Sequence, residues 1–257
     1  MSYGDIMKKS DIYLNCPTSK DKEQDLEVVV NNAIEKKVDV LSIINCIQKA
    51  DGILRTTSSC SSTLKRSTEI ADLQKMRKEI TLLNGIQIPE PYARGNELGL
   101  YAHFPIDVIT GVVYDFKREL EKEEDIKKAY DDYYLKNLYA VQSGNIDTLS
   151  HLGFIHAFYG YKYYNDPLIN ALLEEMIHRN VLLEITPGIS QKGNFSIFPS
   201  SDLLKRYKDL GGEMVTIGTY ANNIQDIGKN LEDGYEIAQD LGLEPGYFQK
   251  RKFKKII

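Results

Sequence analysis

The sequence predicts an α/β protein in which parallel strands form a closed or nearly closed barrel with helices around it. Three observations lead to this fold class. Short apolar segments recur along the 257 residues, segments with a helical apolar stripe separate them, and the apolar segments do not alternate with polar residues. Strands that are apolar on both faces are typical of parallel sheets covered by helices. Alternation of strands with helices indicates β/α units with right-handed crossovers.

Seven segments carry the strand signal. The segment 38–44 (VDVLSII) is the clearest, because β-branched residues dominate it. The segment 213–218 lies directly after Gly211 and Gly212, which end the preceding helix. The predicted strands are 11–16, 38–44, 82–88, 107–114, 147–151, 181–186 and 213–218.

Helical segments follow most of these strands. In residues 25–37 apolar side chains recur at the spacing i, i+3, i+4, i+7 and i+8, which gives one apolar stripe. Pro167 fits the first turn of a helix that starts at Asp166. The predicted helices cover 25–37, 64–81, 121–142, the segment from 166 through Met176, 200–210 and 224–241.

Composition excludes several classes of protein. A net charge of −5 and a pI near 5.5 argue against a general nucleic-acid binder, and no apolar run is long enough to span a membrane. Three cysteines and no apolar leader predict reduced thiols in a cytoplasmic protein. We expect one domain over residues 1–257, with a solvated basic tail at 250–257; contact of this tail with nucleic acid or an anionic membrane is the alternative. The residues do not determine an oligomeric state.

Several motifs resemble those of the polymerase-and-histidinol-phosphatase (PHP) family, and within it the histidinol-phosphate phosphatases. The segment 210–222, LGGEMVTIGTYAN, is similar to the family ending LGG..(I/L)TLGSDAH, and 147–160, DTLSHLGFIHAFYG, is similar to DxxGHLDYVxRYG. Weaker similarity covers the rest of the chain, at DIYLNC (11–16), VLSIINC (40–46), NGIQ (84–87) and IDVITGVVY (106–114). This resemblance implies a distorted seven-stranded TIM-like (β/α) barrel and hydrolysis of a phosphomonoester by two or three metal ions.

The resemblance also implies which positions hold the metal ions, and those positions have lost their ligands. Phenols, amides and a thiol stand where the family has histidines and carboxylates. From the first motif to the last these residues are Tyr13, Asn15, Asn45, Cys46, Gln87, Tyr114, Tyr220 and Asn222. Only His151 keeps the family identity, while Ala157 and Gly188 replace two phosphate-binding arginines. Another ligand position falls near residues 19–21, where the alignment is ambiguous.

One imidazole and a set of neutral oxygens neutralise too little positive charge to hold a cluster of divalent cations. We therefore expect no metal and no cofactor, and a catalytically inactive pseudoenzyme. The pocket formed by these strand ends is expected to bind a small polar or aromatic ligand, or the protein to regulate a partner. Alternatively the tyrosines fill the space of the metals and the amides satisfy one another. A residual or repurposed hydrolase, for example a phosphomonoesterase of histidine biosynthesis, is the enzymatic alternative.

Two further chemistries are weighed for the same residues. Cys46 and His151 could act as nucleophile and base, although their positions on strands two and five argue against a hydrogen bond between them. Cys16, Cys46 and His151 could bind zinc, but their spacing matches no zinc motif. The tyrosines of the helix near residues 128–142 belong either to an interface or to the core.

Overall fold

A computed structural model describes residues 8–15, 25–47, 60–101, 103–159, 162–191, 194–221 and 223–256. Its strands form a single sheet in the order β1-β2-β3-β4-β5-β6-β8-β9-β10, with β7 paired to β6. Neighbouring strands from β1 to β9 along this path are parallel, whereas β10 and β7 are antiparallel to β9 and β6. The strands are β1 (Ser10–Asn15), β2 (Val40–Cys46), β3 (Thr81–Pro89), β4 (Val108–Val112), β5 (Thr148–Leu149), β6 (Leu182–Gln191), β7 (Asn194–Phe198), β8 (Met214–Ile217), β9 (Glu244–Gln249) and β10 (Lys252–Lys255).

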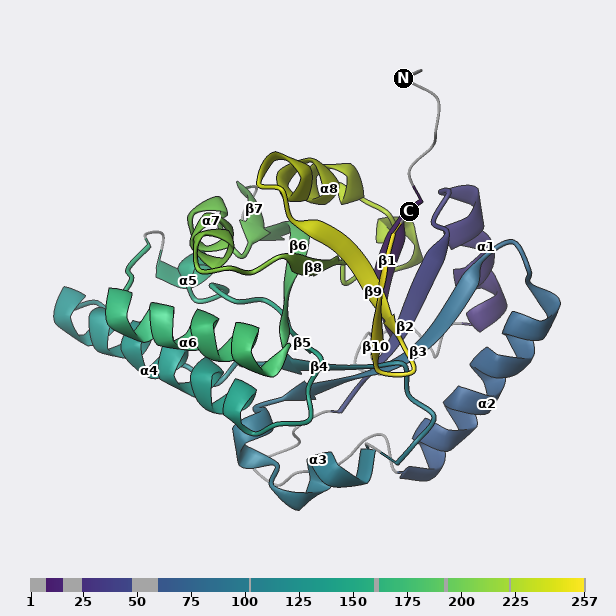
Figure 1. The fold of residues 1–257 in the computed structure, drawn as a ribbon, viewed down its shortest axis with the longest axis horizontal. Helices are drawn as coiled ribbons and strands as arrows, with labels where there is room; N and C mark the ends of the chain where they lie inside the picture. Colours follow the sequence, from purple (N-terminus) through teal and green to yellow (C-terminus); the bar gives the residue numbers. More distant parts are fainter. Residues whose placement is uncertain are drawn as a thin grey trace.

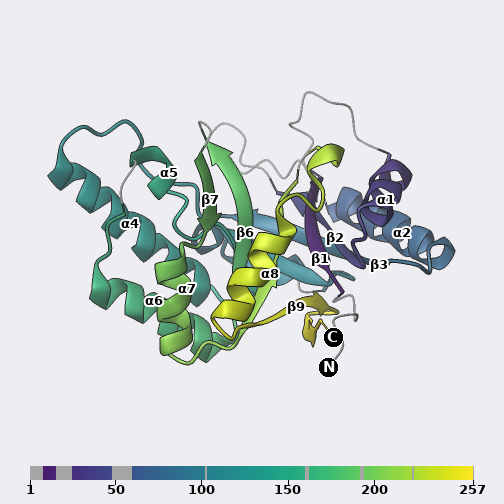
Figure 2. The ribbon, with the colours of Figure 1, turned by 90° about the horizontal axis from the view of Figure 1, so that it is seen from above.

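The helices lie around the strands, which confirms the predicted α/β barrel architecture (Figures 1 and 2). They are α1 (Leu26–Glu35), α2 (Cys60–Met76), α3 (Asn96–Tyr101), α4 (Glu123–Gln142), α5 (His156–Tyr159), α6 (Asp166–Arg179), α7 (Ser201–Asp209) and α8 (Leu231–Asp240), with short 3-10 helices at Pro91–Ala93 and Ile224–Asp226. α1 and α2 lie on one side of the strands, and α4, α6 and α7 lie on the other. Every residue of β2 is buried, as expected for a strand covered on both faces.

The barrel is not closed by backbone pairing between β1 and β8 in the described part of the chain. Side-chain and close backbone contacts join the two strands instead. The Asp11 carboxylate accepts hydrogen bonds from the Thr219 and Gly228 backbone N–H groups, each at 2.7 Å. Gly218 allows the strands to approach closely, because a Cβ atom there would lie 2.5 Å from the Ile12 Cβ.

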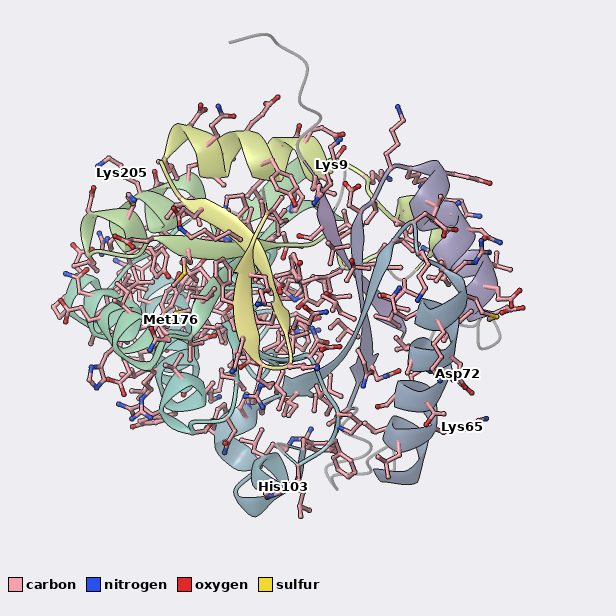
Figure 3. The ribbon with its side chains drawn as sticks, turned by 45° about the vertical axis from the view of Figure 1, so that its right-hand side comes forward. Lys9, Lys65, Asp72, His103, Met176 and Lys205 are labelled. Atoms are coloured by element: carbon pink, nitrogen blue, oxygen red, sulfur yellow. The ribbon has the colours of Figure 1, made fainter. Side chains whose placement is uncertain are left out.

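Side chains from the helices complete the core. Figure 3 shows Met176 among the buried side chains, whereas Lys65, Asp72 and Lys205 lie at the surface. The tyrosines of α4 belong mainly to this core: Tyr130, Tyr133 and Tyr134 are at most 1% exposed, and Tyr139 is 47% exposed. The core alternative for the tyrosine-rich helix is therefore correct for three of its four tyrosines.

Residues 250–255, which were expected to be a solvated basic tail, belong to a hairpin with β9. Lys250 and Arg251 form the turn of a hairpin, and the backbone from Lys252 to Lys255 pairs with β9. The Lys250 N–H donates to the Asp107 carboxylate at 2.8 Å, and Arg251 forms an ion pair with Asp147. Asp107 and Asp147 thus hold this basic segment in place. The charge composition of the segment does not reveal partners that lie far away in the sequence. The lysines of β10 are exposed, as predicted.

Several element boundaries also differ from the sequence expectation. The predicted helix 224–241 is a 3-10 turn followed by α8, and α2 starts at Cys60, in a segment expected to be a loop. Strands β7, β9 and β10 were not predicted. Pro245 and Gly246 weaken the strand signal of β9, which pairs with β8 through only part of its length.

None of the helices in the described ranges combines the length and the apolar character needed to span a bilayer.

Candidate functional site

Parallel strands place several of the predicted residues at the carboxyl end of the barrel. Asn45 and Cys46 end β2, Gln87 lies near the end of β3, Tyr114 follows β4, His151 follows β5 and Tyr220 follows β8. All except Tyr114 are less than 8% exposed. Tyr13 and Asn15 belong to β1, where Asn15 lies opposite Asn45 in the parallel register. Their side chains, and the whole of Asn222, lie outside the described part of the structure.

His151 lies at the centre of these residues. Its Nδ1 atom is hydrogen-bonded to the Tyr114 hydroxyl at 2.8 Å. The Tyr220 ring packs on the imidazole, with ring centroids 4.6 Å apart. Burial lowers the pKa of His151 to about 4, so the imidazole is neutral at neutral pH. The structure therefore brings Tyr114, His151 and Tyr220 together as a neutral aromatic cluster.

The backbone at this cluster is strained. His151 has φ of 57° and Tyr220 has φ of 49°, in the left-handed region that residues with a Cβ rarely adopt. Each such residue costs on the order of 1–3 kcal/mol. Tyr133, from α4, holds the first of them: its hydroxyl donates to the His151 carbonyl at 3.0 Å and accepts from the Gly153 N–H at 3.1 Å.

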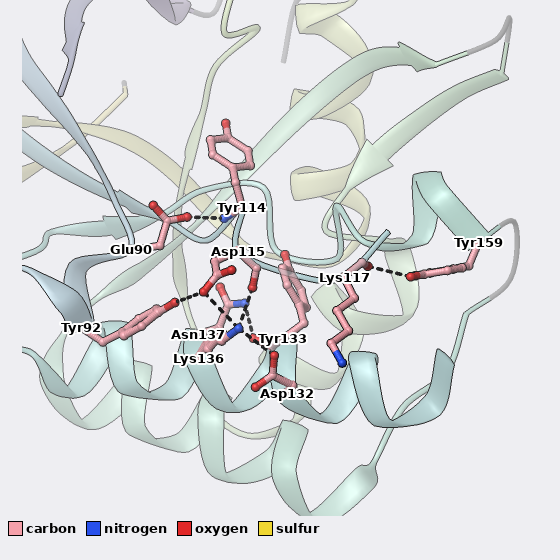
Figure 4. Close-up of polar contacts among 10 residues, drawn as sticks. All are labelled: Glu90, Tyr92, Tyr114, Asp115, Lys117, Asp132, Tyr133, Lys136, Asn137 and Tyr159. Atoms are coloured by element: carbon pink, nitrogen blue, oxygen red, sulfur yellow. Dashed lines mark hydrogen bonds and ion pairs between the residues drawn. The ribbon is translucent and has the colours of Figure 1, made fainter. Parts of the chain in front are cut away.

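The segment after β4 is held in a comparable way, as Figure 4 shows. The Tyr114 N–H donates to the buried Glu90 carboxylate at 3.0 Å. Next along the chain, Asp115 accepts from the Tyr92 hydroxyl at 3.1 Å and pairs with Lys136 of α4. These contacts fix the backbone on both sides of Tyr114 and thus the direction of its hydroxyl toward His151.

Cys46 and His151 interact with different partners. The Cys46 thiol donates to the Gln87 side-chain oxygen at 3.5 Å, while His151 pairs with Tyr114. This arrangement offers no support for the Cys46–His151 pair weighed from the sequence. The zinc alternative included Cys16, which lies outside the described residues.

Two buried carboxyl groups inside the barrel were missed by the sequence reasoning. Glu184 is at the middle of the apolar run VLLEIT in β6 and is 0% exposed, and burial raises its pKa to about 8. Asp11 is equally buried; burial raises its pKa to about 6 against the opposing effect of its backbone hydrogen bonds. A single carboxylate within an otherwise apolar strand is the sequence signal that could have identified Glu184.

Several polar atoms in this region are buried without a protein partner in the described structure. They are Gln87 Nε2, His151 Nε2 and Thr186 Oγ1. A buried polar atom without a hydrogen bond costs about 1–3 kcal/mol, so these atoms favour a polar molecule or solvent close to them. Donors and acceptors are both present, which suits a neutral polar group better than an ion.

The donors among the described residues do not form a ligand set for a cluster of metal ions. Among the described residues, no three His, Cys, Asp or Glu side chains lie close enough to hold a metal. The Nδ1 bond to Tyr114 leaves His151 only Nε2 for a metal, and the Asp11 carboxylate is occupied by the backbone amides of Ile12, Thr219 and Gly228. Multinuclear metal sites need several anionic or imidazole ligands that face one another.

Comparison with known sequences identifies two histidinol-phosphatase relatives. No family model matches the chain. A protein of Clostridium acetobutylicum, assigned as a histidinol-phosphatase, is 27% identical over 148 residues, which is 54% of this chain and 57% of the relative. A Thermotoga maritima protein with the same assignment is 33% identical over 107 residues, 40% of this chain and 44% of the relative. The chain thus spans about half the length of the curated relatives it matches.

Solved structures show the same relationship at the level of the fold. The histidinol phosphate phosphatase of Lactococcus lactis, crystallised with zinc, L-histidinol and phosphate, superposes with a TM-score of 0.77 at 20% identity; the match covers 96% of this chain and 99% of that one. A Listeria monocytogenes protein assigned to the same activity gives a TM-score of 0.65 at 13% identity, covering 88% and 99%. The chain therefore has the mixed α/β, TIM-like fold of a histidinol phosphatase and is similar in sequence to proteins assigned to that activity.

Proposed function

We propose that this chain is a PHP-type relative of the histidinol-phosphate phosphatases that has lost metal-dependent hydrolysis and acts as a ligand-binding or partner-regulating module. One observation carries the proposal. His151, the position expected to contribute a metal ligand, is bonded to Tyr114 and packed against Tyr220, and among the described residues no three His, Cys, Asp or Glu side chains form a metal-binding group. A phenol is a poor metal ligand at neutral pH, since its pKa is near 10 in water. Burial raises the pKa of the Tyr114 phenol further.

The chemistry of the cluster indicates what it could bind instead. Its groups are phenol, imidazole, amide and thiol, and Glu184, a fully buried carboxyl of β6, has a raised pKa of about 8 that favours its neutral form at pH 7. Ala157 and Gly188 stand where the resemblance implies two arginines that would bind a multiply charged phosphate bidentately. A small neutral polar or aromatic molecule, or a protein partner, suits this site better.

The proposal is tested by metal analysis and turnover on the same preparation. The full chain is purified without chelators, its metal content is measured by elemental analysis, and hydrolysis of histidinol phosphate and p-nitrophenyl phosphate is assayed with added Mn²⁺, Zn²⁺ or Fe²⁺. We expect less than one tightly bound metal per chain and no turnover above background. Two or more bound metals per chain would overturn the pseudoenzyme proposal.

A matched pair of histidine variants distinguishes residual catalysis from a contaminant. His151→Ala removes the imidazole at the strand ends. His156→Ala removes another largely buried imidazole, also with a pKa near 4, which is bonded to Tyr134 at 2.9 Å. Turnover lost in His151→Ala and kept in His156→Ala would support the alternative of a residual or repurposed hydrolase. The similarity to proteins assigned as histidinol-phosphatases is the observation that favours this alternative.

A further inference from the structure

A cavity lies at the opposite end of the barrel from His151. Its volume is about 560 Å³, within the range of small-molecule sites. The end of α4, the end of α6 and the β9–β10 hairpin form its walls. Strand β5 separates the two regions, because Asp147 lines this cavity at the amino end of the strand and His151 follows its carboxyl end.

The walls combine an apolar surface with two guanidinium groups. Val141, Ile146, Met214, Phe248 and Phe253 are among the apolar residues of the lining. The Phe248 and Phe253 rings meet edge to face, with centroids 5.8 Å apart, which holds both rings in place. The charged residues of the lining are Asp147, Arg179 and Arg251.

The acidic group among the described lining residues is already neutralised by the protein. Asp147 forms an ion pair with Arg251 and accepts from the Ile109 N–H at 2.8 Å. Arg251 also donates through Nη2 to the Asn145 carbonyl at 3.1 Å, so its guanidinium is held by two partners. The Asp147 carboxylate is therefore a poor partner for a ligand cation.

Several of the carbonyl groups in the last turns of the two helices are paired with backbone amides. At the end of α4, the Tyr139 carbonyl accepts from Ser143 N–H at 2.9 Å, and the Val141 carbonyl accepts from Gly144 N–H at 3.3 Å. At the end of α6, the Met176 carbonyl accepts from Val181 N–H at 2.9 Å. Helix carboxyl ends attract cations mainly through unpaired carbonyls, and this pairing reduces that attraction here.

The Nη atoms of Arg179 are the donors that a ligand in this cavity could use. Its Nε atom pairs with Glu175 on the outer side of α6, and its Nη1 atom lies beside Gly144 in the cavity wall, 3.9 Å from where a Cβ would be. The guanidinium is anchored at one edge, so its orientation toward the cavity costs little additional entropy on binding. An anionic group is the chemical complement of these donors.

We infer that this cavity is a binding site for a small molecule with an apolar, aromatic body and one anionic group. The phenylalanine and aliphatic walls receive the body, and Arg179 binds the anion at the rim. This site is independent of the proposed function at the strand carboxyl ends, since it uses none of the residues there.

The test uses two fluorescent probes of similar shape and different charge. The anionic probe is 8-anilinonaphthalene-1-sulfonate, and the neutral one is N-phenyl-1-naphthylamine. Each is titrated into folded full-length protein, whose integrity is checked by circular dichroism. We expect the anionic probe to bind the wild-type chain about tenfold more tightly than the neutral probe, as a charge-assisted contact predicts.

Three variants locate the binding. Arg179→Gln should raise the Kd of the anionic probe several-fold and leave that of the neutral probe unchanged. Met214→Trp should weaken both probes because the larger ring fills the cavity. Arg77→Gln is the matched control: Arg77 also pairs with a glutamate, Glu79, but lies at the end of α2. The inference is overturned if Arg179→Gln binds the anionic probe like Arg77→Gln does, if Met214→Trp has no effect, or if the anionic probe does not bind.

Discussion

Replacing Tyr133 by Phe tests how the barrel holds His151 in its strained conformation. The change removes one oxygen atom that is fully buried and bonded on both sides, to the His151 carbonyl and the Gly153 N–H. The His151 carbonyl keeps a second donor, the Phe154 N–H at 2.9 Å. Removing the hydrogen bond from the Tyr133 hydroxyl to this carbonyl therefore costs about 1 kcal/mol of stability. The Gly153 N–H loses this buried acceptor, at a cost of about 1–3 kcal/mol. Together we expect a loss of about 2–4 kcal/mol in the free energy of unfolding.

Urea denaturation followed by circular dichroism measures this loss. Tyr139→Phe is the control, because Tyr139 lies on the same helix and is 47% exposed; surface changes of this kind are usually within about 0.5 kcal/mol of the parent. If Tyr133→Phe and Tyr139→Phe have the same stability, the view that the Tyr133 hydroxyl holds the His151 turn is wrong.

Three other predictions follow from buried groups and close contacts. Glu184 has a folded-state pKa raised from 4.5 to about 8, so its ionisation destabilises the fold as pH rises from about 4.5 toward 8. The free energy of unfolding of Glu184→Gln, measured by urea titration relative to wild type, should therefore be higher at pH 8.5 than at pH 5 by at least about 2 kcal/mol. The same difference between variant and wild type at both pH values would contradict this. Burial lowers the pKa values of His151 and His156 to about 4, so NMR of both imidazoles should show the neutral form from pH 5.5 to 8, and a midpoint near 6.5 would refute it. Gly218→Ala should cost about 1–3 kcal/mol in thermal or urea unfolding, because a Cβ there would lie 2.5 Å from a side-chain carbon of β1. Gly99→Ala is its control, since a Cβ there meets nothing within 4 Å and alanine favours the helix; equal effects would disprove the close contact.

The order of the barrel elements could be predicted from local patterns. α1 is an example: the apolar stripe at Leu26, Val29, Val30 and Ala33 is buried, as its spacing predicted. β2 is buried along its whole length, in keeping with its β-branched residues. These patterns succeed because a helix or strand needs one continuous apolar face, and neighbouring residues determine that face.

The hairpin of β9 and β10 could not be predicted in the same way. Its basic residues indicated a solvated tail, but the turn is held by Asp107 and Asp147, more than a hundred positions away in the chain. Glu184 shows a related difficulty. Its position in an apolar strand was visible, but its raised pKa depends on strands that surround it in the fold.

The sequence by itself determined the alternation of strands and helices and which residue types follow the carboxyl ends of the strands. Parallel strands make those residues neighbours, so the members of the candidate site follow from the positions of the strands along the chain. Only the tertiary structure decided what they do to one another: Tyr114 bonds to His151, Tyr220 packs on it, and Tyr133 holds its backbone. Local periodicity cannot specify these contacts, because each joins residues that are distant in the chain and depends on side-chain directions fixed only when the barrel is assembled.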